Sequence, residues 1–241
     1  MLQTVSERTR EVITKKGARC LLTSITALVL LVPVYAADQQ KDEDTLQQAN
    51  IVLNDMLNDK SIPQDLLSKA DCVMVLPGVK KFSIGIGGSG GRGPLLCRTG
   101  QNFDGKWSAP AMYSVGGVSA GVQLGGTSSD FVLLLMTRKV VNQILNGKTK
   151  MGTDATAAAG PGATAASASD ADIFTYGRAK GLFAGVSLGG ASVEPDNDAN
   201  NRLYDKRLVP GDIVRGTDVK PTPGGKPLVT LLDSKLAKHM N

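Results

Sequence analysis

The chain has few of the side chains that perform most enzyme chemistry. Its 241 residues include a single histidine, His239, close to the C-terminus. Catalytic triads, metal sites and general bases that depend on histidine therefore lack their main residue. No cysteine has a partner at metal-ligand spacing, and no candidate nucleophile stands beside a candidate base. We expect a protein that is not an enzyme and that uses no metal and no cofactor.

The chain also lacks an apolar run long enough to span a bilayer comfortably. Its main run, from Leu21 to Val34, leads into Ala36 and Ala37 and follows a basic segment that contains Arg8, Arg10, Lys15, Lys16 and Arg19. This order predicts a signal peptide over residues 1–36, cleaved after Ala36, with an uncleaved anchor as the alternative. Cys20 precedes the run, whereas the lipidated cysteine of a lipoprotein follows it. We expect a soluble protein exported to the periplasm, with peripheral attachment to a membrane as a further option.

A large excess of charge of either sign is missing once the signal peptide is removed. The remaining chain has 22 basic and 20 acidic side chains, a net charge of +2. This balance gives no reason to expect nucleic acid as a partner. About two hundred residues are enough for one domain with a substantial core.

What the chain does have is a repeated phrase. Gly117–Ser128 and Gly181–Ser192 agree at eight of twelve positions, and both alternate apolar residues with small or polar ones. Alternation with a period of two is typical of a strand with one apolar face, so we predict two similar strands of one sheet or barrel. Glycine on the other face allows sharp bends or close approach of another surface.

The remaining patterns predict a single α+β domain with a strand-rich, glycine-rich sheet or barrel-like core and peripheral helices, the N-terminal helices coming first. Residues 37–70 form the helical segment, 71–214 the strand-rich core and 215–241 a linker and C-terminal tail. We expect helices at 42–59, 61–70, 137–145 and 201–206, the second opened by a capping box at Ser61. Strands are expected at 72–76, 82–86, 94–98, 111–125, 131–136, 172–176 and 182–193.

Two cysteines remain after export, Cys72 and Cys97, each in a strand-like apolar run. In an oxidising compartment they can form a disulfide across neighbouring strands. Buried free cysteines that act as small hydrophobic residues are the alternative.

Two apparent ligand motifs fail on their context. Gly85–Gly90 fits the spacing of a dinucleotide-binding loop, but a strand and not a helix is expected to follow it, which favours a glycine-rich hairpin. The acidic stretch from Glu194 to Asn200 resembles the start of a calcium loop, yet it lacks the turn glycine and the closing glutamate. A turn that caps the next helix is the better interpretation.

Basic residues gather near the ends of the expected strands. If the strands run side by side, they lie at one rim and can receive lipid phosphates, while the alternative is ordinary solvated strand ends. Trp107, the only tryptophan, is either a core anchor or a residue at a lipid–water boundary. The candidate lipid-binding residues are Lys80, Lys81, Arg92, Arg98, Lys106, Trp107, Arg178 and Lys180.

Several motifs in fixed order resemble the SYLF domain family over about residues 44–206. They are Leu76-Pro77, the glycine-rich segment to Arg98, Trp107-Ser-Ala-Pro110, Gly121-x-x-x-Gly-Gly126, Asp130-Phe-Val-Leu-Leu-Leu-Met136, Gly152-x-Asp154, Gly160-Pro161 and Tyr176-Gly-Arg-Ala-Lys180-Gly-Leu-Phe-Ala-Gly185.

This resemblance implies a non-catalytic module that binds acidic phospholipids, with actin binding in fungal members. The chain departs from the family in two ways. Its N-terminal helix is acidic where eukaryotic members have a basic amphipathic segment, and export to a bacterial periplasm makes actin an improbable partner. We expect acidic phospholipid or a membrane surface as the ligand. An envelope structural or protein-interaction module, with an unknown protein partner, is the second hypothesis.

Overall fold

The computed structural model describes residues 32–84, 86–120, 125–151, 157–159, 171–179, 182–183, 188 and 190–235. The chain divides into two compact units, Met1–Lys41 and Asp42–Asn241. The second unit is an α+β domain in which a long helix precedes the strands, which confirms the expected fold class.

The N-terminal helix is longer than predicted. Helix α2 spans Val32–Asn58, so it begins before the expected start at residue 42. Its buried residues recur at helical spacing and pack toward the sheet: Leu46, Ala49, Val52, Leu53, Met56 and Leu57. Helix α3 spans Gln64–Lys69 and has Pro63 at its N-cap without a side-chain hydrogen bond. The predicted capping box is therefore wrong, because the Ser61 hydroxyl donates to Asp59 instead.

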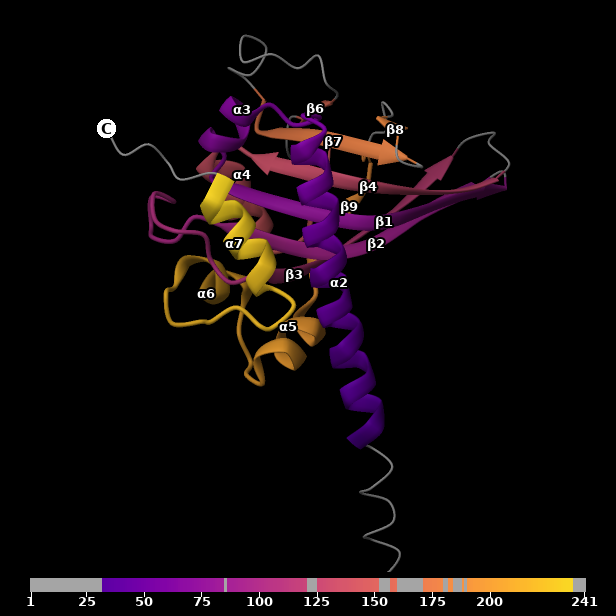
Figure 1. Cartoon of the computed structure of the whole chain (residues 1–241). Helices are drawn as coiled ribbons and strands as arrows, with labels where there is room; N and C mark the ends of the chain where they lie inside the picture. Colours follow the sequence, from indigo (N-terminus) through magenta and orange to yellow (C-terminus); the bar gives the residue numbers. More distant parts are fainter. Residues whose placement is uncertain are drawn as a thin grey trace, which may run out of the picture. The chain divides into compact units, whose positions relative to one another are not determined.

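One nine-stranded sheet forms the centre of the domain (Figure 1). Its strand order is β5-β9-β3-β2-β1-β4-β7-β6, with β8 paired to β7. Among the described strands, β6 and β7 are the only parallel pair. The long strands are β1 (Cys72–Ile84), β2 (Ile86–Cys97), β3 (Ala111–Ala120), β4 (Gly125–Leu135) and β7 (Ile173–Ala179). The short strands are β5 (Thr149–Lys150), β6 (Ala157–Ala159), β8 (Leu182–Phe183) and β9 (Ser192–Pro195).

The glycine-rich segment forms an antiparallel hairpin, because Ile84 pairs with Ile86 and β2 follows at once. Strand β1 contains the predicted strand 72–76 and most of the predicted strand 82–86. Its pairing with β4 shifts register between Leu76 and Val79. Gly78 adopts a φ of 60° within this irregularity, and its N–H donates to the Asp130 carboxylate at 2.9 Å.

In the described residues, the repeated phrase is divided among four strands. Its first copy covers the end of β3 and the start of β4, and residues 121–124 of the predicted strand over 111–125 lie outside the described residues. Strands β3 and β4 are not neighbours, since β2 and β1 lie between them in the sheet. The second copy, 181–192, lies largely outside the described residues; its described part includes β8 and the first residue of β9.

Side chains cap two of the remaining helices. In α4 (Arg138–Leu145), Thr137 accepts a hydrogen bond from the Val140 N–H. In α5 (Asn197–Tyr204), Asp196 accepts from the Ala199 N–H, so this helix begins earlier than predicted. The acidic stretch before α5 is thus a helix cap, as the sequence favoured. The last described helices are α6 (Pro210–Arg215) and α7 (Lys226–Lys235).

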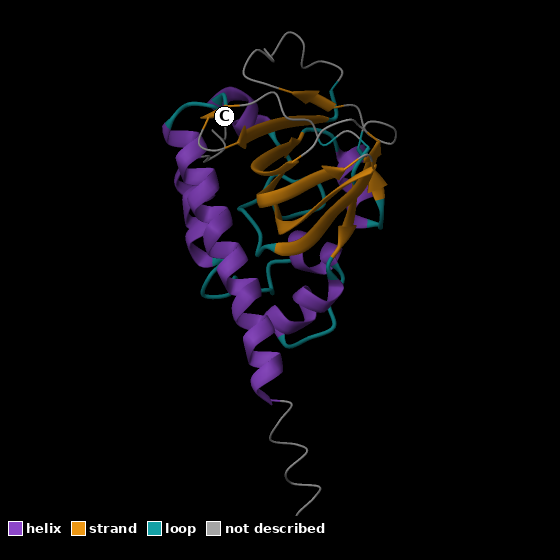
Figure 2. Cartoon of the chain, turned by 90° about the vertical axis from the view of Figure 1, so that its right-hand side faces the viewer, coloured by secondary structure: helices purple, strands orange, loops and turns teal. Residues whose placement is uncertain are grey.

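Apolar clusters lie on both faces of the sheet. One joins the sheet to α4 and α6, and the other joins it to α2, α3 and α7. Figure 2 shows α2 running along one side of the strands. Residues Phe131–Leu135 of β4 are completely buried and alternate between the two clusters, which agrees with an apolar run covered on both faces. Helix α7 buries Leu228 and Leu232, so the described part of segment 215–241 packs on the core and is not a free tail.

Candidate functional site

The predicted basic residues divide between two ends of the sheet. Lys80 of β1 pairs with Gly90 of β2 and Ser128 of β4, close to the hairpin end. Arg98 and Trp107 form an isolated bridge beyond Cys97, which pairs with Cys72 at the opposite end of β1. The described residues therefore do not make one rim. Lys180 lies outside the described residues.

Lys80 is exposed and lies toward the end of β1, which finishes at Ile84. Lys81 is half-buried on the other face, with its ammonium 5.6 Å from the centre of the Phe131 ring. Burial lowers the pKa of Lys81 because its charged form loses hydration. Val79 and Phe131 belong to the apolar core, so Lys81 lies beside that core.

Arg178 is held by acidic side chains. Its guanidinium lies 3.4 Å from an Asp55 oxygen, 3.9 Å from Asp59 and 3.6 Å from Asp130. The Arg178 side chain is 14% exposed. Asp55 of α2 and Asp59 just after it therefore attach this helix to β7, while Asp130 links Arg178 to β4. Arg178 serves packing more than it serves an external phosphate.

Arg92 also belongs to an internal ion-pair network. It contacts Asp42 at 2.6 Å and Asp196 at 2.8 Å, while Arg202 contacts the other Asp42 oxygen at 2.8 Å. Burial opposes the charge of Arg92, but the two carboxylates outweigh it and raise the pKa of Arg92. Asp42 is completely buried, so both arginines are needed to offset the loss of its hydration.

A second acidic residue of α2 holds the segment before α7. The Glu43 carboxylate accepts from the Thr222 hydroxyl at 2.9 Å and from the Gly224 N–H at 2.6 Å. Sequence reasoning noted only that this helix is acidic and missed both roles. Their partners lie between 50 and 181 residues away, and no local pattern indicates such contacts.

Trp107 is a core anchor and not a boundary residue. It is 4% exposed and belongs to the cluster beneath α2 and α7. Arg98 is 3% exposed, with its guanidinium 4.8 Å from the centre of the indole ring. Burial lowers the pKa of Arg98, while Asp233 and Asp71 oppose that shift. Neither side chain offers a surface to lipid, whereas the neighbouring Lys106 is exposed.

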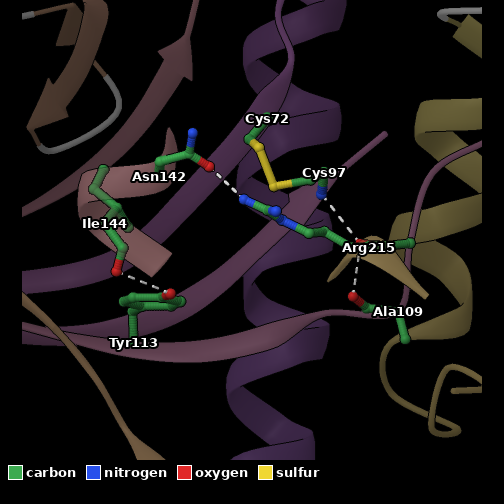
Figure 3. Close-up of a disulfide and its surroundings, with 8 residues drawn as sticks. Cys72, Cys97, Ala109, Tyr113, Asn142, Ile144 and Arg215 are labelled. Carbon is green, nitrogen blue, oxygen red and sulfur yellow. Dashed lines mark hydrogen bonds between the residues drawn. A yellow bond between two sulfur atoms is a disulfide. The ribbon is translucent and has the colours of Figure 1, made fainter. Parts of the chain in front are cut away.

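Cys72 and Cys97 form a disulfide between directly paired positions of β1 and β2 (Figure 3). Both residues are fully buried in the cluster beneath α4 and α6. The Cys97 N–H donates to the Ser108 hydroxyl at 3.1 Å, and the Tyr113 hydroxyl donates to the Ile144 carbonyl at 3.3 Å. The disulfide therefore lies in a packed interior. Its surroundings are those of a structural disulfide and not of an accessible redox centre.

The geometry offers little to reaction chemistry. In the described part of the chain, no group of three or more histidine, cysteine, aspartate or glutamate residues is placed to hold a metal ion. The segment with dinucleotide-loop spacing leads into β2 and not into a helix, so it lacks the helix N-terminus that holds a pyrophosphate. Across the same described residues, every helix falls short of the length and apolarity that crossing a membrane requires.

These features define an α+β domain with a broad, mainly antiparallel sheet and helices on both faces, in which Arg92, Arg178 and Arg202 pair with acidic side chains of the same domain. Residues 116–235 match the family model Ysc84, described as "Las17-binding protein actin regulator". The chain belongs to this Ysc84, or SYLF, domain family.

Relatives come from fungi and animals. LAS seventeen-binding protein 3 of Saccharomyces cerevisiae (strain YJM789) is 31% identical over 185 residues, covering 73% of this chain and 39% of the yeast protein. The human SH3 domain-containing YSC84-like protein 1 is 32% identical over 189 residues, covering 76% of this chain and 54% of the human protein. The chain thus spans about two fifths to one half of the length of these relatives.

Proposed function

We propose that this chain is a non-catalytic module of the cell envelope that binds acidic phospholipid. Membership of the Ysc84 family supports a binding role. The observation that carries the lipid assignment is Lys80, an exposed cation in the part of β1 that pairs with the start of β2. A lysine near an anionic membrane contributes about 1 kcal/mol of attraction, so such a contact is weak unless other residues add to it.

The N-terminal helix does not supply that contact in the folded domain. The apolar face of α2 is buried against the sheet. Asp42, Asp55 and Asp59 form ion pairs with arginines of the same domain. Lipid contact through this helix requires breaking these ion pairs and exposing core residues. Lys80, and Lys106 at the opposite end, reach solvent without any rearrangement.

The proposed compartment is the periplasm, reached by cleavage after Ala36. The family description and the name of the yeast relative mention actin regulation and Las17 binding, and an exported bacterial chain meets neither partner. N-terminal sequencing of the protein from a periplasmic extract tests this assignment. Ala37 as the first residue supports export, whereas an intact Met1 in the cytoplasmic fraction contradicts it.

Vesicle flotation tests lipid binding. The purified protein is mixed with vesicles of phosphatidylglycerol and phosphatidylethanolamine, or of phosphatidylcholine alone, at low and high salt. We expect co-flotation with the acidic vesicles that weakens as salt screens the charges. Lys80→Glu removes one attraction and adds one repulsion, so the partition coefficient should fall about 30-fold, the equivalent of about 2 kcal/mol.

Lys139→Glu is the matched control, because Lys139 is also exposed and its replacement makes the same change in net charge. Equal losses in the two variants would mean that only net charge matters and that β1 does not face the membrane. Absence of co-flotation under all conditions would refute lipid binding and leave the envelope interaction module as the working hypothesis.

A further inference from the structure

A cleft of about 540 Å³ opens between the C-terminal end of α4 and helix α6, and none of the residues assigned to lipid above is among those that line it. We name it the α4–α6 cleft; the argument uses six of its lining residues: Gln101, Asn146, Val209, Gly211, Asp212 and Arg215. Its volume falls in the range of small-molecule sites. None of its residues belongs to the ion-pair networks that hold α2.

The cleft has a fixed polar wall. The Arg215 guanidinium lies 5.5 Å from the centre of the Phe103 ring and donates to the Asn142 side chain, as Figure 3 shows for the second contact. The Arg215 carbonyl accepts from the Gly100 N–H at 3.2 Å. Both the backbone and the side chain of Arg215 are therefore held in place before any ligand arrives, which reduces the entropy lost on binding.

The lining combines donors with acceptors. Gln101 and Asn146 each offer an amide that both donates and accepts, Arg215 only donates, and Asp212 accepts when ionised. Asp218 adds a second carboxylate, so two negative charges face one positive charge. A phosphate would be repelled by this excess, whereas hydroxyl groups, which donate and accept, can satisfy each of these partners.

An apolar surface borders the same cleft. Val209 is 61% exposed, and among the described residues only Ile51 is another large apolar side chain with comparable exposure. A sugar ring presents hydroxyls around its edge and C–H groups on its faces. It can hydrogen-bond to the amides and carboxylates while one face covers Val209.

We propose that the α4–α6 cleft binds a neutral oligosaccharide. The proposal does not depend on lipid binding, because the cleft shares no residue with the Lys80 end of the sheet. Gly211 provides a direct way to block the cleft, since a Cβ placed on this residue meets no heavy atom within 4 Å. Gly211→Trp should fill the open space, and Gly211→Ala should leave it open.

Saturation-transfer NMR tests the proposal with maltotriose, cellotriose and chitotriose, each at millimolar concentration. We expect transfer from the protein to at least one sugar, retained in Gly211→Ala and lost in Gly211→Trp. Gln101→Ala with Asn146→Ala removes two hydrogen-bonding amides and should raise the dissociation constant about tenfold or more. The unfolding midpoint of each variant shows that the domain remains folded, because all three altered positions lie at the surface.

Inorganic phosphate and spermine serve as charged probes of the same cleft. Absence of transfer to all three sugars would overturn the proposal, as would transfer that survives Gly211→Trp. Chemical-shift changes at Asn146 and Arg215 with phosphate or spermine, but not with sugar, would equally overturn it. Gly211→Trp should co-float with acidic vesicles to the same extent as the unmodified protein. This measurement distinguishes a failure of the oligosaccharide proposal from a failure of lipid binding.

Discussion

Removing the Cys72–Cys97 disulfide should lower the stability of the domain substantially. The two cysteines are 25 residues apart in sequence, and both are fully buried. Closing a loop of that length in the unfolded chain removes conformational entropy worth about 3.5 kcal/mol at room temperature. The variant Cys72→Ala/Cys97→Ala gives up this constraint, and it also loses packing in the cluster beneath α4 and α6.

Trp107 provides the assay. It is the only tryptophan and is buried, so urea unfolding should change its fluorescence strongly. With a urea slope of about 2 to 3 kcal/mol per molar, a loss of about 3.5 kcal/mol lowers the midpoint by roughly 1.5 M. The slope itself should rise, because an unfolded chain without the crosslink exposes more surface.

The unmodified protein unfolded in the presence of dithiothreitol is the control, since it loses the crosslink and keeps both cysteine side chains. Its midpoint should approach that of the double variant, with the remaining difference reporting lost packing. A double variant that loses less than about 1 kcal/mol, with an unchanged slope, would refute the argument from loop closure.

Two further predictions follow from the packing. Gly93→Ala would place a Cβ 1.9 Å from the Val75 carbonyl oxygen. We therefore expect the free energy of unfolding, measured in urea, to fall by about 2 to 4 kcal/mol. In the control Gly126→Ala the nearest atom lies 4.0 Å from the added Cβ, and the loss should be less than about 1 kcal/mol. Burial raises the pKa of Tyr176 to about 12 from the ordinary value of 10.0, and it raises the pKa values of Tyr113 and Tyr204 as well. The unfolded chain therefore loses these protons first, and stability that is complete below pH 10.0 should decline as pH rises toward the folded values. Unfolding midpoints in alkaline buffers measure the decline, and stability that increases over this range would contradict it. Tyr176→Phe should weaken the decline at little cost near neutral pH, because the Tyr176 hydroxyl is buried without a hydrogen-bond partner.

The sequence predicted the local elements better than their connections. The stretch Phe131–Leu135 is apolar without alternation, which is typical of a strand covered on both faces, and the structure buries it completely. The acidic stretch before α5 was interpreted as a helix cap, which the structure confirms. The alternation over 111–125 predicted one strand, whereas Ala111–Ala120 belong to β3 and Gly125 begins β4, which is not a neighbour of β3 in the sheet. The capping box predicted before α3 was wrong for a similar reason, since a capping pattern at Ser61 is local and the observed Ser61–Asp59 contact competes with it.

The candidate site shows the same limit. Sequence proximity to strand ends indicated a basic rim, and the fold divided those residues between two ends of the sheet and placed Arg92 and Arg178 among carboxylates. The α4–α6 cleft had no sequence signal, because its lining comes from the loop after β2, the end of α4 and the surroundings of α6. Contacts between segments this far apart depend on packing and not on any spacing along the chain.

By itself, the sequence determined the family, the α+β class and the burial of the central strand, since ordered motifs and periodic apolar residues are properties of the chain alone. Only the tertiary structure decided which charges are neutralised internally and which remain in solvent. A charge is stabilised by the partners that folding brings near it, and Asp42 acquires Arg92 and Arg202 from 50 and 160 residues away. Lys80 gained no such ion pair among the described residues, and this difference made it the candidate for an external ligand.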